Sequence, residues 1–146
     1  MINNFKEEKN KFLSNFYITS IPFYFAGYTW DCSEIPYQAM KATNESDFLL
    51  IANSKTPGES KKLGKKINIS KNFNLYKVEI MWTILLAKFS LPKEKNMLIS
   101  TEENILIEGN YWHDNFWGDC FCPKCKEIEG INTLGKLLME LRNELK

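Results

Sequence analysis

Histidine is nearly absent from this 146-residue chain, which contains only His113. A hydrolase that holds its catalytic zinc ion with three histidines is therefore excluded. An excess of one charge is also lacking, because 19 lysine and arginine residues face 18 acidic residues and leave a net charge of +1. This balance gives no electrostatic case for a protein that binds nucleic acid over its whole surface.

Long apolar runs are lacking as well. The longest uncharged apolar stretch, residues 80–87, is far too short to span a bilayer. The first residues do not show the basic and then apolar pattern of a signal peptide. We therefore expect a cytoplasmic protein with no membrane partner, in which the four cysteines form no disulfide framework.

Nucleotide-binding glycine motifs are missing too, since neither the Rossmann fingerprint nor the P-loop pattern occurs. Aromatic residues, in contrast, are abundant at 14%, with 10 Phe, 6 Tyr and 4 Trp. Such residues fill cores, and they also stack on bases and sugars.

The apolar spacing and the turn residues predict one mainly helical α+β domain over residues 1–146, with a few short strands and no β-α-β alternation. The expected elements are an extended segment at 12–32 with a hairpin turn at Gly27, helices that begin at Ser33 and Thr56, helices at 45–53, 76–90 and 133–145, and a short strand at 104–108. We expect Pro92 to end the segment at 76–90, and Asn132 or Thr133 to cap the last helix. The apolar residues of the segment at 76–90 share one wide helical face: Val78, Met81, Trp82, Leu85, Leu86 and Phe89. The last helix carries a leucine stripe: Leu134, Leu137, Leu138, Leu141 and Leu145.

A helix after Ser33 would place four polar or aromatic side chains on one face: Glu34, Tyr37, Gln38 and Lys41. One interpretation is an exposed helix with a Glu34–Lys41 pair. The other is a pocket wall, where burial and mutual charge would tune both pKa values for proton transfer or nucleophilic attack. The basic run Lys61–Lys66 is either a solvated helix end or a patch that faces phosphate.

A second cluster, residues 108–119, combines aromatic rings, carboxylates and glycines without helical spacing. A loop this hydrophobic must either pack as a structural loop or bind a flat ligand.

Four motifs together resemble the NADAR (YbiA-like) family and occur in the family's order over residues 12–142. They are Phe-Leu-Ser-Asn-Phe-Tyr at 12–17, the Glu-x-x-Tyr-Gln-Ala-x-Lys segment at 34–41, Asp-x-x-Trp-Gly at 114–118, and the Gly-x-Asn-x-Leu-Gly-Lys-x-Leu-Met-x-x-Arg segment at 130–142. The resemblance implies an α+β fold and an N-glycosidase that hydrolyses the C1′–N bond of a ribosyl phosphate, such as a riboflavin-pathway intermediate, or of ADP-ribosylated guanine in DNA. The alternative is a non-catalytic module that binds or sequesters ADP-ribose-like nucleotides.

Cleavage of a C1′–N bond creates oxocarbenium character, which a carboxylate stabilises while an acid assists the leaving nitrogen. Glu34 and Asp114 are the matching carboxylates, and Lys41 is the candidate for addition to C1′ as a Schiff base or for protonation of the leaving group. No catalytic cofactor is required. The resemblance and the residue types suggest these substrate-binding residues: Asn15, Phe16, Tyr37, Gln38, Trp82, Glu108, Trp117, Gly118, Asn132 and Gly135. For Trp82, core packing is the competing interpretation, and the helix start at 132–135 is a candidate phosphate site.

A cysteine-rich insertion at 120–125 departs from the family pattern. Cys120, Cys122 and Cys125, with His113 seven residues before the first, would supply a Cys₃His set for a structural zinc ion. Three reduced thiols or a redox-labile pair are the alternatives. Cys32 would be the substitute ligand if His113 points away.

Overall fold

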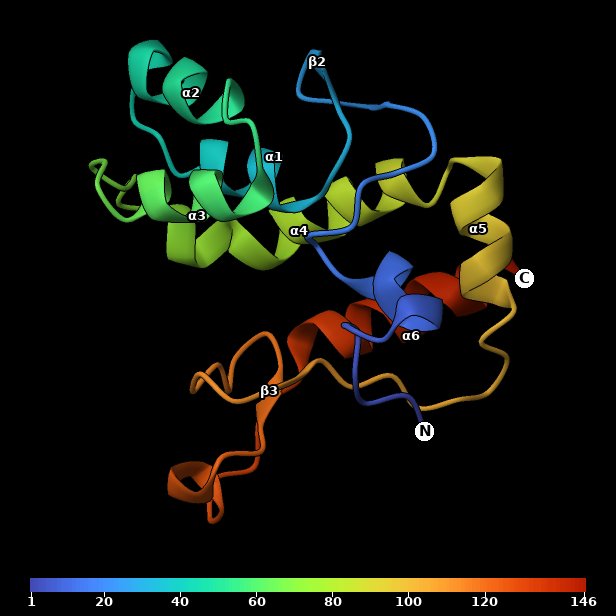
Figure 1. The fold of residues 1–146 in the computed structure, drawn as a ribbon. Helices are drawn as coiled ribbons and strands as arrows, with labels where there is room; N and C mark the ends of the chain where they lie inside the picture. Colours follow the sequence, from blue (N-terminus) through green and yellow to red (C-terminus); the bar gives the residue numbers. More distant parts are fainter. The chain divides into compact units, whose positions relative to one another are not determined.

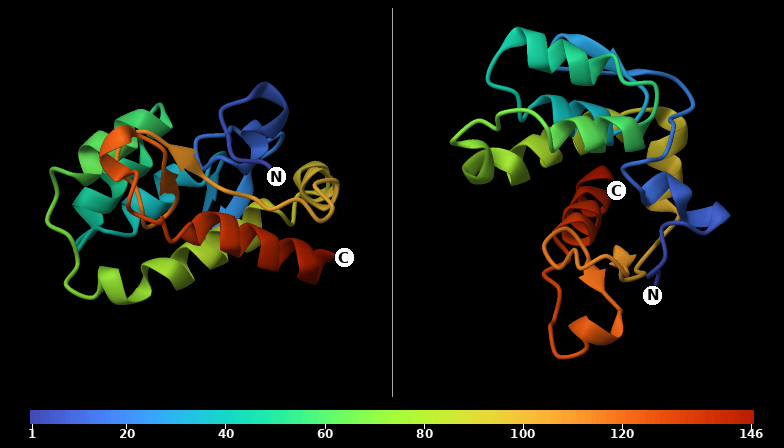
Figure 2. Two further views of the ribbon diagram at one scale, coloured as in Figure 1. Left: turned by 90° about the horizontal axis from the view of Figure 1, so that it is seen from below. Right: turned by 60° about the vertical axis from the view of Figure 1, so that its left-hand side comes forward.

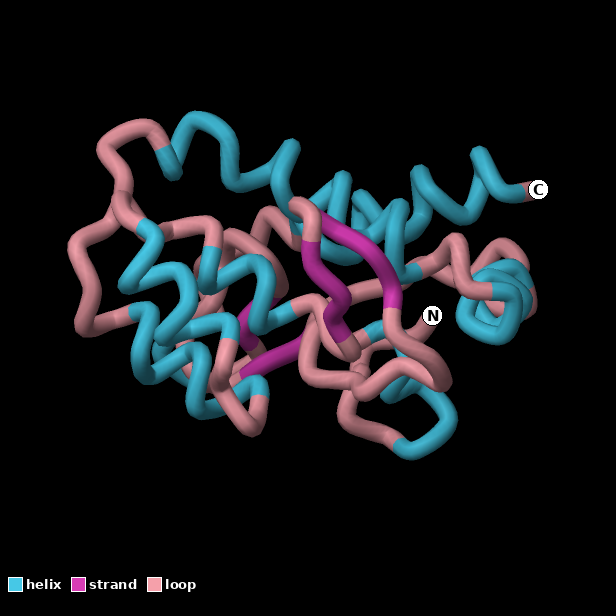
Figure 3. Tube along the Cα trace, turned by 90° about the horizontal axis from the view of Figure 1, so that it is seen from above, coloured by secondary structure: helices cyan, strands magenta, loops and turns pink.

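The computed structural model describes residues 1–146, which divide into two compact units. One unit combines Met1–Ser14 with Pro92–Lys146, and the other is Asn15–Leu91. Helices dominate both units and the strands are few and short, as Figure 3 shows, so the predicted α+β class is confirmed. The prediction of a single domain stays a prediction.

The Asn15–Leu91 unit begins with a hairpin of β1 (Phe23–Phe25) and β2 (Tyr28–Trp30), which pair antiparallel. Ala26 and Gly27 at the turn both have positive φ, as a type I′ hairpin requires. The turn predicted at Gly27 is thus confirmed. The wider extended segment is wrong at its start, because residues up to Leu13 belong to the 3₁₀ helix η1 (Glu8–Leu13).

Four helices follow in this unit: α1 (Glu34–Ala39), α2 (Glu45–Ala52), α3 (Pro57–Gly64) and α4 (Phe73–Lys88). The side chains of Asn44 and Thr56 cap α2 and α3 by accepting from the N–H groups of Asp47 and Glu59, at 2.8 and 3.1 Å. Helix α1 packs against α2, α3 and α4 (Figure 1).

Helix α4 begins three residues earlier than predicted and supplies much of the core of this unit. Met81 and Leu85 are buried as expected, but Val78 and Leu86 are 36% and 40% exposed. The predicted apolar face was therefore too wide, because neighbouring elements cover only part of the helix circumference.

The other unit contains η1, α5 (Pro92–Ile99), β3 (Gly109–Asn110), β4 (Asp119–Cys120), the 3₁₀ helix η2 (Pro123–Cys125) and α6 (Thr133–Leu145). Helix α5 packs on η1 and α6, and the segment from β3 to η2 extends from these helices (Figure 2). Strands β3 and β4 form a two-residue parallel pair.

The segment at 76–90 ends before Pro92 as expected, since α4 stops at Lys88. The sequence analysis did not predict that Pro92 then occupies the first position of a further helix, α5, where its missing N–H costs nothing. The strand expected at 104–108 is reduced to one bridge between Ile2 and Leu106, and pairing begins only at Gly109.

Helix α6 confirms the predicted leucine stripe, with Leu134, Leu138 and Leu141 at most 1% exposed. The Nη1 group of the buried Arg142 donates to Thr101 Oγ1 at 2.8 Å and to the carbonyl of Asn104 at 2.9 Å. None of the helices is both long enough and apolar enough to cross a membrane.

Gly135 is one of the positions where a single added methyl group should be costly. A Cβ atom there would overlap the carbonyl oxygen of Leu106, so Gly135→Ala should lower the free energy of unfolding by about 1–3 kcal/mol. Gly58 in α3 faces open space, so Gly58→Ala is the matched control and should raise it by about 0.5–1 kcal/mol. Urea unfolding measures the free energy of unfolding of both variants. A Gly135→Ala variant more stable than wild type would contradict the close approach of Gly135 to the Leu106 carbonyl.

Candidate functional site

Glu34 and Gln38 lie on one face of α1 and are almost fully buried, with 8% and 5% of their surfaces exposed. The side-chain amide of Gln38 donates to Glu34 Oε1 at 2.7 Å. This contact has the spacing of one helical turn that the sequence predicted. The interpretation of α1 as an exposed helix is therefore wrong, whereas the pocket-wall interpretation stays a prediction.

The motif at residues 12–17 is joined to α1 through the backbone, because the N–H of Glu34 donates to the carbonyl of Asn15 at 3.0 Å. Asn15 Oδ1 and Gln38 Oε1 are both buried and have no hydrogen-bond partner within the protein. Gly64 leaves room for Gln38, since a Cβ atom there would overlap Gln38 Oε1. A buried acceptor without a donor is unfavourable, so these two oxygens are suited to a ligand that brings hydroxyl groups.

Lys41 follows the end of α1 and lies beside two aromatic rings. Its Nζ atom is 5.5 Å from the ring centroid of Tyr37 and 5.7 Å from that of Phe73. These rings pack edge to face, with centroids 5.4 Å apart. The carbonyl of Lys41 accepts from the N–H of Ser70 at 2.8 Å, which holds the backbone in place.

Burial lowers the pKa of the Lys41 ammonium from its ordinary value of 10.5. The negative charge of Glu34 acts in the opposite direction, while the positive charges of Lys61, Lys65 and Lys77 lower the pKa further. The charges of three further amines therefore act on Lys41. The free amine of Lys41 is more available than that of an exposed lysine, and the surroundings favour an anionic ligand.

The remaining predicted residues of this unit are Phe16 and Trp82. Phe16 is 45% exposed, and the Nζ atom of Lys61 lies 5.9 Å from its ring centroid. Trp82 lies on α4 and is half-buried, so core packing does not take up its whole surface.

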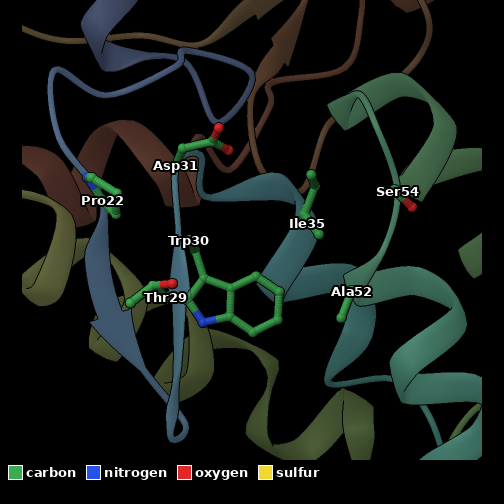
Figure 4. Close-up of a pocket in the computed structure, with 7 residues that line it drawn as sticks. All are labelled: Pro22, Thr29, Trp30, Asp31, Ile35, Ala52 and Ser54. Carbon is green, nitrogen blue, oxygen red and sulfur yellow. The ribbon is translucent and has the colours of Figure 1, made fainter.

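A small pocket near the hairpin was not predicted from the sequence. It has a cavity volume of about 240 Å³ and is lined by Pro22, Thr29, Trp30, Asp31, Ile35, Ala52 and Ser54. Figure 4 shows these residues coming from the hairpin, the start of α1 and the end of α2. None of the predicted catalytic residues lines it, although Ile35 follows Glu34 directly.

Asp114 belongs to the other unit, where its carboxylate shapes a turn. Asp114 Oδ1 accepts from the N–H groups of Phe116 and Trp117 at 3.1 and 2.9 Å. Sequence reasoning missed Asn110, which is 1% exposed; its amide donates to the carbonyl of Asp114 at 2.7 Å and its Oδ1 accepts from the Asp114 N–H at 3.1 Å. A single asparagine after a glycine gives too weak a signal to reveal this role.

The predicted residues around Asp114 pack closely with one another. The rings of Phe116 and Trp117 meet edge to face with centroids 5.0 Å apart, and both residues are half-buried. Gly118 packs directly against the backbone of Glu108, because a Cβ atom at position 118 would overlap the Glu108 carbonyl oxygen. Glu108 itself is half-buried.

Asn132 precedes α6 in a left-handed conformation with φ of 55°. Its side chain does not cap the helix: Oδ1 accepts from the N–H of Glu108 at 3.0 Å, and Nδ2 donates to the carbonyl of Leu106 at 2.8 Å. The N–H groups of Thr133 and Leu134 donate to loop carbonyls, both at 3.0 Å. The expectation of an open phosphate site at 132–135 is therefore wrong, since the protein already occupies these first-turn amides.

The cysteines at 120–125 come together with His113, as the sequence predicted. His113 Nδ1 lies 3.3 Å from the sulfur atoms of Cys122 and Cys125 and 3.9 Å from that of Cys120. These four donor atoms lie within 4.8 Å of one another, and a metal ion could bind among them. His113 completes this set and Cys32, which is fully buried in the other unit, is not needed for it.

Comparison with known proteins agrees with this arrangement of motifs. A family model named NADAR domain matches residues 3–146. The chain belongs to the NADAR family. Among NADAR relatives, a riboflavin biosynthesis protein PYRR from Zea mays is 32% identical over 131 residues, which are 81% of this chain and 20% of the relative. The chain thus spans about a fifth of that protein's length.

Bacterial relatives are closer to the chain in length. An N-glycosidase from Nostoc punctiforme is 33% identical over 80% of this chain and 75% of its own. N-glycosidase YbiA from Escherichia coli is 34% identical over 82% of this chain and 72% of its own. The NMR structure of the E. coli YbiA protein matches with a TM-score of 0.81 and 31% identity, covering 99% of this chain and 84% of that one.

Proposed function

We propose that this NADAR-family protein is an N-glycosyl hydrolase that acts on a ribosyl phosphate or an ADP-ribosyl adduct. In the reaction the C1′–N bond breaks, a hydroxyl group from water is added to C1′, and the leaving nitrogen takes up a proton. The observation that carries the proposal is the buried Glu34–Gln38 pair near Lys41, an amine whose pKa is lowered. The names of the bacterial relatives support the reaction class.

Glu34 is the proposed carboxylate that stabilises positive charge at the anomeric carbon, and Gln38 orients it. Lys41 is the proposed nucleophile, because its free amine can add to C1′ of the ring-opened glycosylamine. The C1′–N bond to the leaving amine then breaks, the amine departs with a proton, and the sugar is left as a Schiff base on Lys41. Hydrolysis of that Schiff base returns the amine and releases the sugar.

Binding groups for such a substrate are present in the same unit. The unpartnered oxygens of Asn15 and Gln38 are proposed to accept hydrogen bonds from sugar hydroxyls. The positive charges of Lys61, Lys65 and Lys77 are proposed to attract the phosphate.

The roles predicted for residues of the other unit stay predictions. Asp114 stays a predicted catalytic carboxylate, and Trp117 and Trp82 stay predicted stacking residues for the base or sugar. The same holds for substrate binding by Glu108, Gly118, Asn132 and Gly135. The Cys₃His cluster has a structural part in this proposal, because four protein ligands leave no open position for a substrate. A cytoplasmic location also stays a prediction.

The direct test is incubation of the full chain with three ligands, followed by mass analysis. The ligands are an early riboflavin-pathway ribosylamine phosphate, free ADP-ribose, and a DNA oligonucleotide with ADP-ribosylated guanine. We expect release of the free amine from the first, or of ADP-ribose from the third, since both carry the C1′–N bond that the proposed groups attack.

Intact ligands together with a rise in melting temperature would contradict the enzyme and favour a binding module. Neither cleavage nor a shift with any ligand would contradict both. The same assay on Asp114→Asn tests the charge of that carboxylate, because the amide oxygen can still accept from Phe116 and Trp117. Full turnover in this variant would remove Asp114 from the mechanism.

A further inference from the structure

We propose that the cluster of His113, Cys120, Cys122 and Cys125 binds one structural zinc ion. The cluster belongs to the segment from β3 to η2, drawn in orange in Figure 1. Thiolate sulfur and imidazole nitrogen are the ligands that zinc takes in closed tetrahedral sites. The spacing of Cys122 and Cys125, with two residues between them, is the usual one for such a site.

The distances in the cluster agree with tetrahedral coordination. With Zn–S bonds of about 2.3 Å and a Zn–N bond of about 2.0 Å, a tetrahedron separates nitrogen from each sulfur by about 3.5 Å. The observed separations of His113 Nδ1 from the three sulfurs are 3.3, 3.3 and 3.9 Å. All three cysteines are free, so no disulfide bond accounts for their approach.

The surroundings of the sulfurs also fit a metal ion better than an apolar core. The three cysteines are buried, at 3%, 9% and 4% exposure, and form a hydrophobic cluster of their own with no leucine, valine or phenylalanine in it. His113, whose side chain meets them, has φ of 69°. A non-glycine residue in this left-handed region is strained, and a bound ion would offset that strain.

Hydrogen bonds around the cluster hold the ligands in place. Asn115 Nδ2 donates to Cys125 Sγ at 3.4 Å, and Asn115 Oδ1 accepts from the N–H of Cys120 at 2.9 Å. The N–H of Cys125 donates to the carbonyl of Cys122 at 3.0 Å, which closes the turn between them. Such outer hydrogen bonds orient metal ligands and tune their charge.

Zinc would fix the backbone on both sides of Asp114, because His113 precedes this residue and Asn115 follows it. The metal would thus set the loop geometry without taking part in the reaction. This last step rests on the proposed function, whereas metal binding itself does not.

Metal analysis of the full chain tests the inference. The purified protein, or protein refilled with Zn²⁺ after chelation, should contain about one zinc ion per chain, and the chelator should lower the melting temperature. The double variant Cys122→Ser/Cys125→Ser should lose the zinc. Cys32→Ala is the matched control and should keep it, because burial raises the pKa of the Cys32 thiol to about 11 and it lies outside the cluster.

Co²⁺ added to the wild-type chain after chelation provides a readout that needs no variant to fold. Visible absorption typical of tetrahedral thiolate–Co²⁺ complexes should appear and should disappear when Zn²⁺ is added. Folded protein without bound zinc or this absorption would overturn the inference, as would full zinc content in the double variant. Zinc bound to a chain that cleaves no ligand would support the inference and contradict the proposed function.

Discussion

Glu34→Gln should lower kcat by about 10²–10⁴-fold with little change in stability. The substitution removes the negative charge but keeps an oxygen that can accept from Gln38. The loss should therefore appear in turnover rather than in folding. Steady-state kinetics on the ligand that is cleaved, with a thermal melt of the same sample, measures both effects.

Glu79→Gln is the matched control, because Glu79 is an exposed carboxylate on α4 of the same unit. This variant should keep wild-type kcat. Equal activity of Glu34→Gln and wild type would remove Glu34 from the mechanism, whereas a large drop in melting temperature would show that its charge serves the fold.

Lys41→Arg should lower kcat on the order of 10³-fold or more. Arginine keeps the positive charge near Tyr37 and Phe73, but it cannot add to a sugar carbon as a free amine. Borohydride reduction during turnover should attach the sugar to the wild-type chain and leave Lys41→Arg unmodified, as mass analysis would show. Lys62→Arg, at an exposed position of α3, should behave as wild type in both assays.

The pH dependence of turnover provides a second readout for Lys41. The free amine is the reactive form, and the folded protein disfavours the ammonium because burial lowers its pKa below 10.5. The rate should therefore rise with increasing pH and level off above the lowered pKa, at a pH below 10.5. A rate that falls steadily as pH rises would show that Lys41 acts as a proton donor instead.

Local signals made much of the fold predictable. Thr56, Pro57 and Glu59 mark the start of α3, and the leucine spacing of α6 marks its buried face. Each signal depends on residues within one or two turns of each other, so it is readable without tertiary information. The strand at 109–110 was missed because its two residues pair only through long-range contacts.

The candidate site was predictable in its residues but not in its contacts. The helical spacing of Glu34 and Gln38 predicted that they share one face of α1, and the structure adds the hydrogen bond between them. The spacing of the cysteines and of His113 likewise anticipated the cluster, although the sequence left Cys32 open as a substitute for His113. The sequence did not reveal that loop carbonyls accept hydrogen bonds from the first N–H groups of α6. The partners of a helix N-terminus depend on how distant segments pack.

The two buried, unpartnered oxygens of Asn15 and Gln38 also bear on selectivity. A sugar that lacks a hydroxyl would leave one of them desolvated in the complex, and sites built to pair with a hydroxyl reject such analogues strongly. If ribose is the sugar that binds there, the protein can discriminate against 2-deoxyribose without any steric block. The missing 2′-hydroxyl would leave a buried oxygen without a hydrogen-bond donor, and this weakens binding of the deoxy sugar.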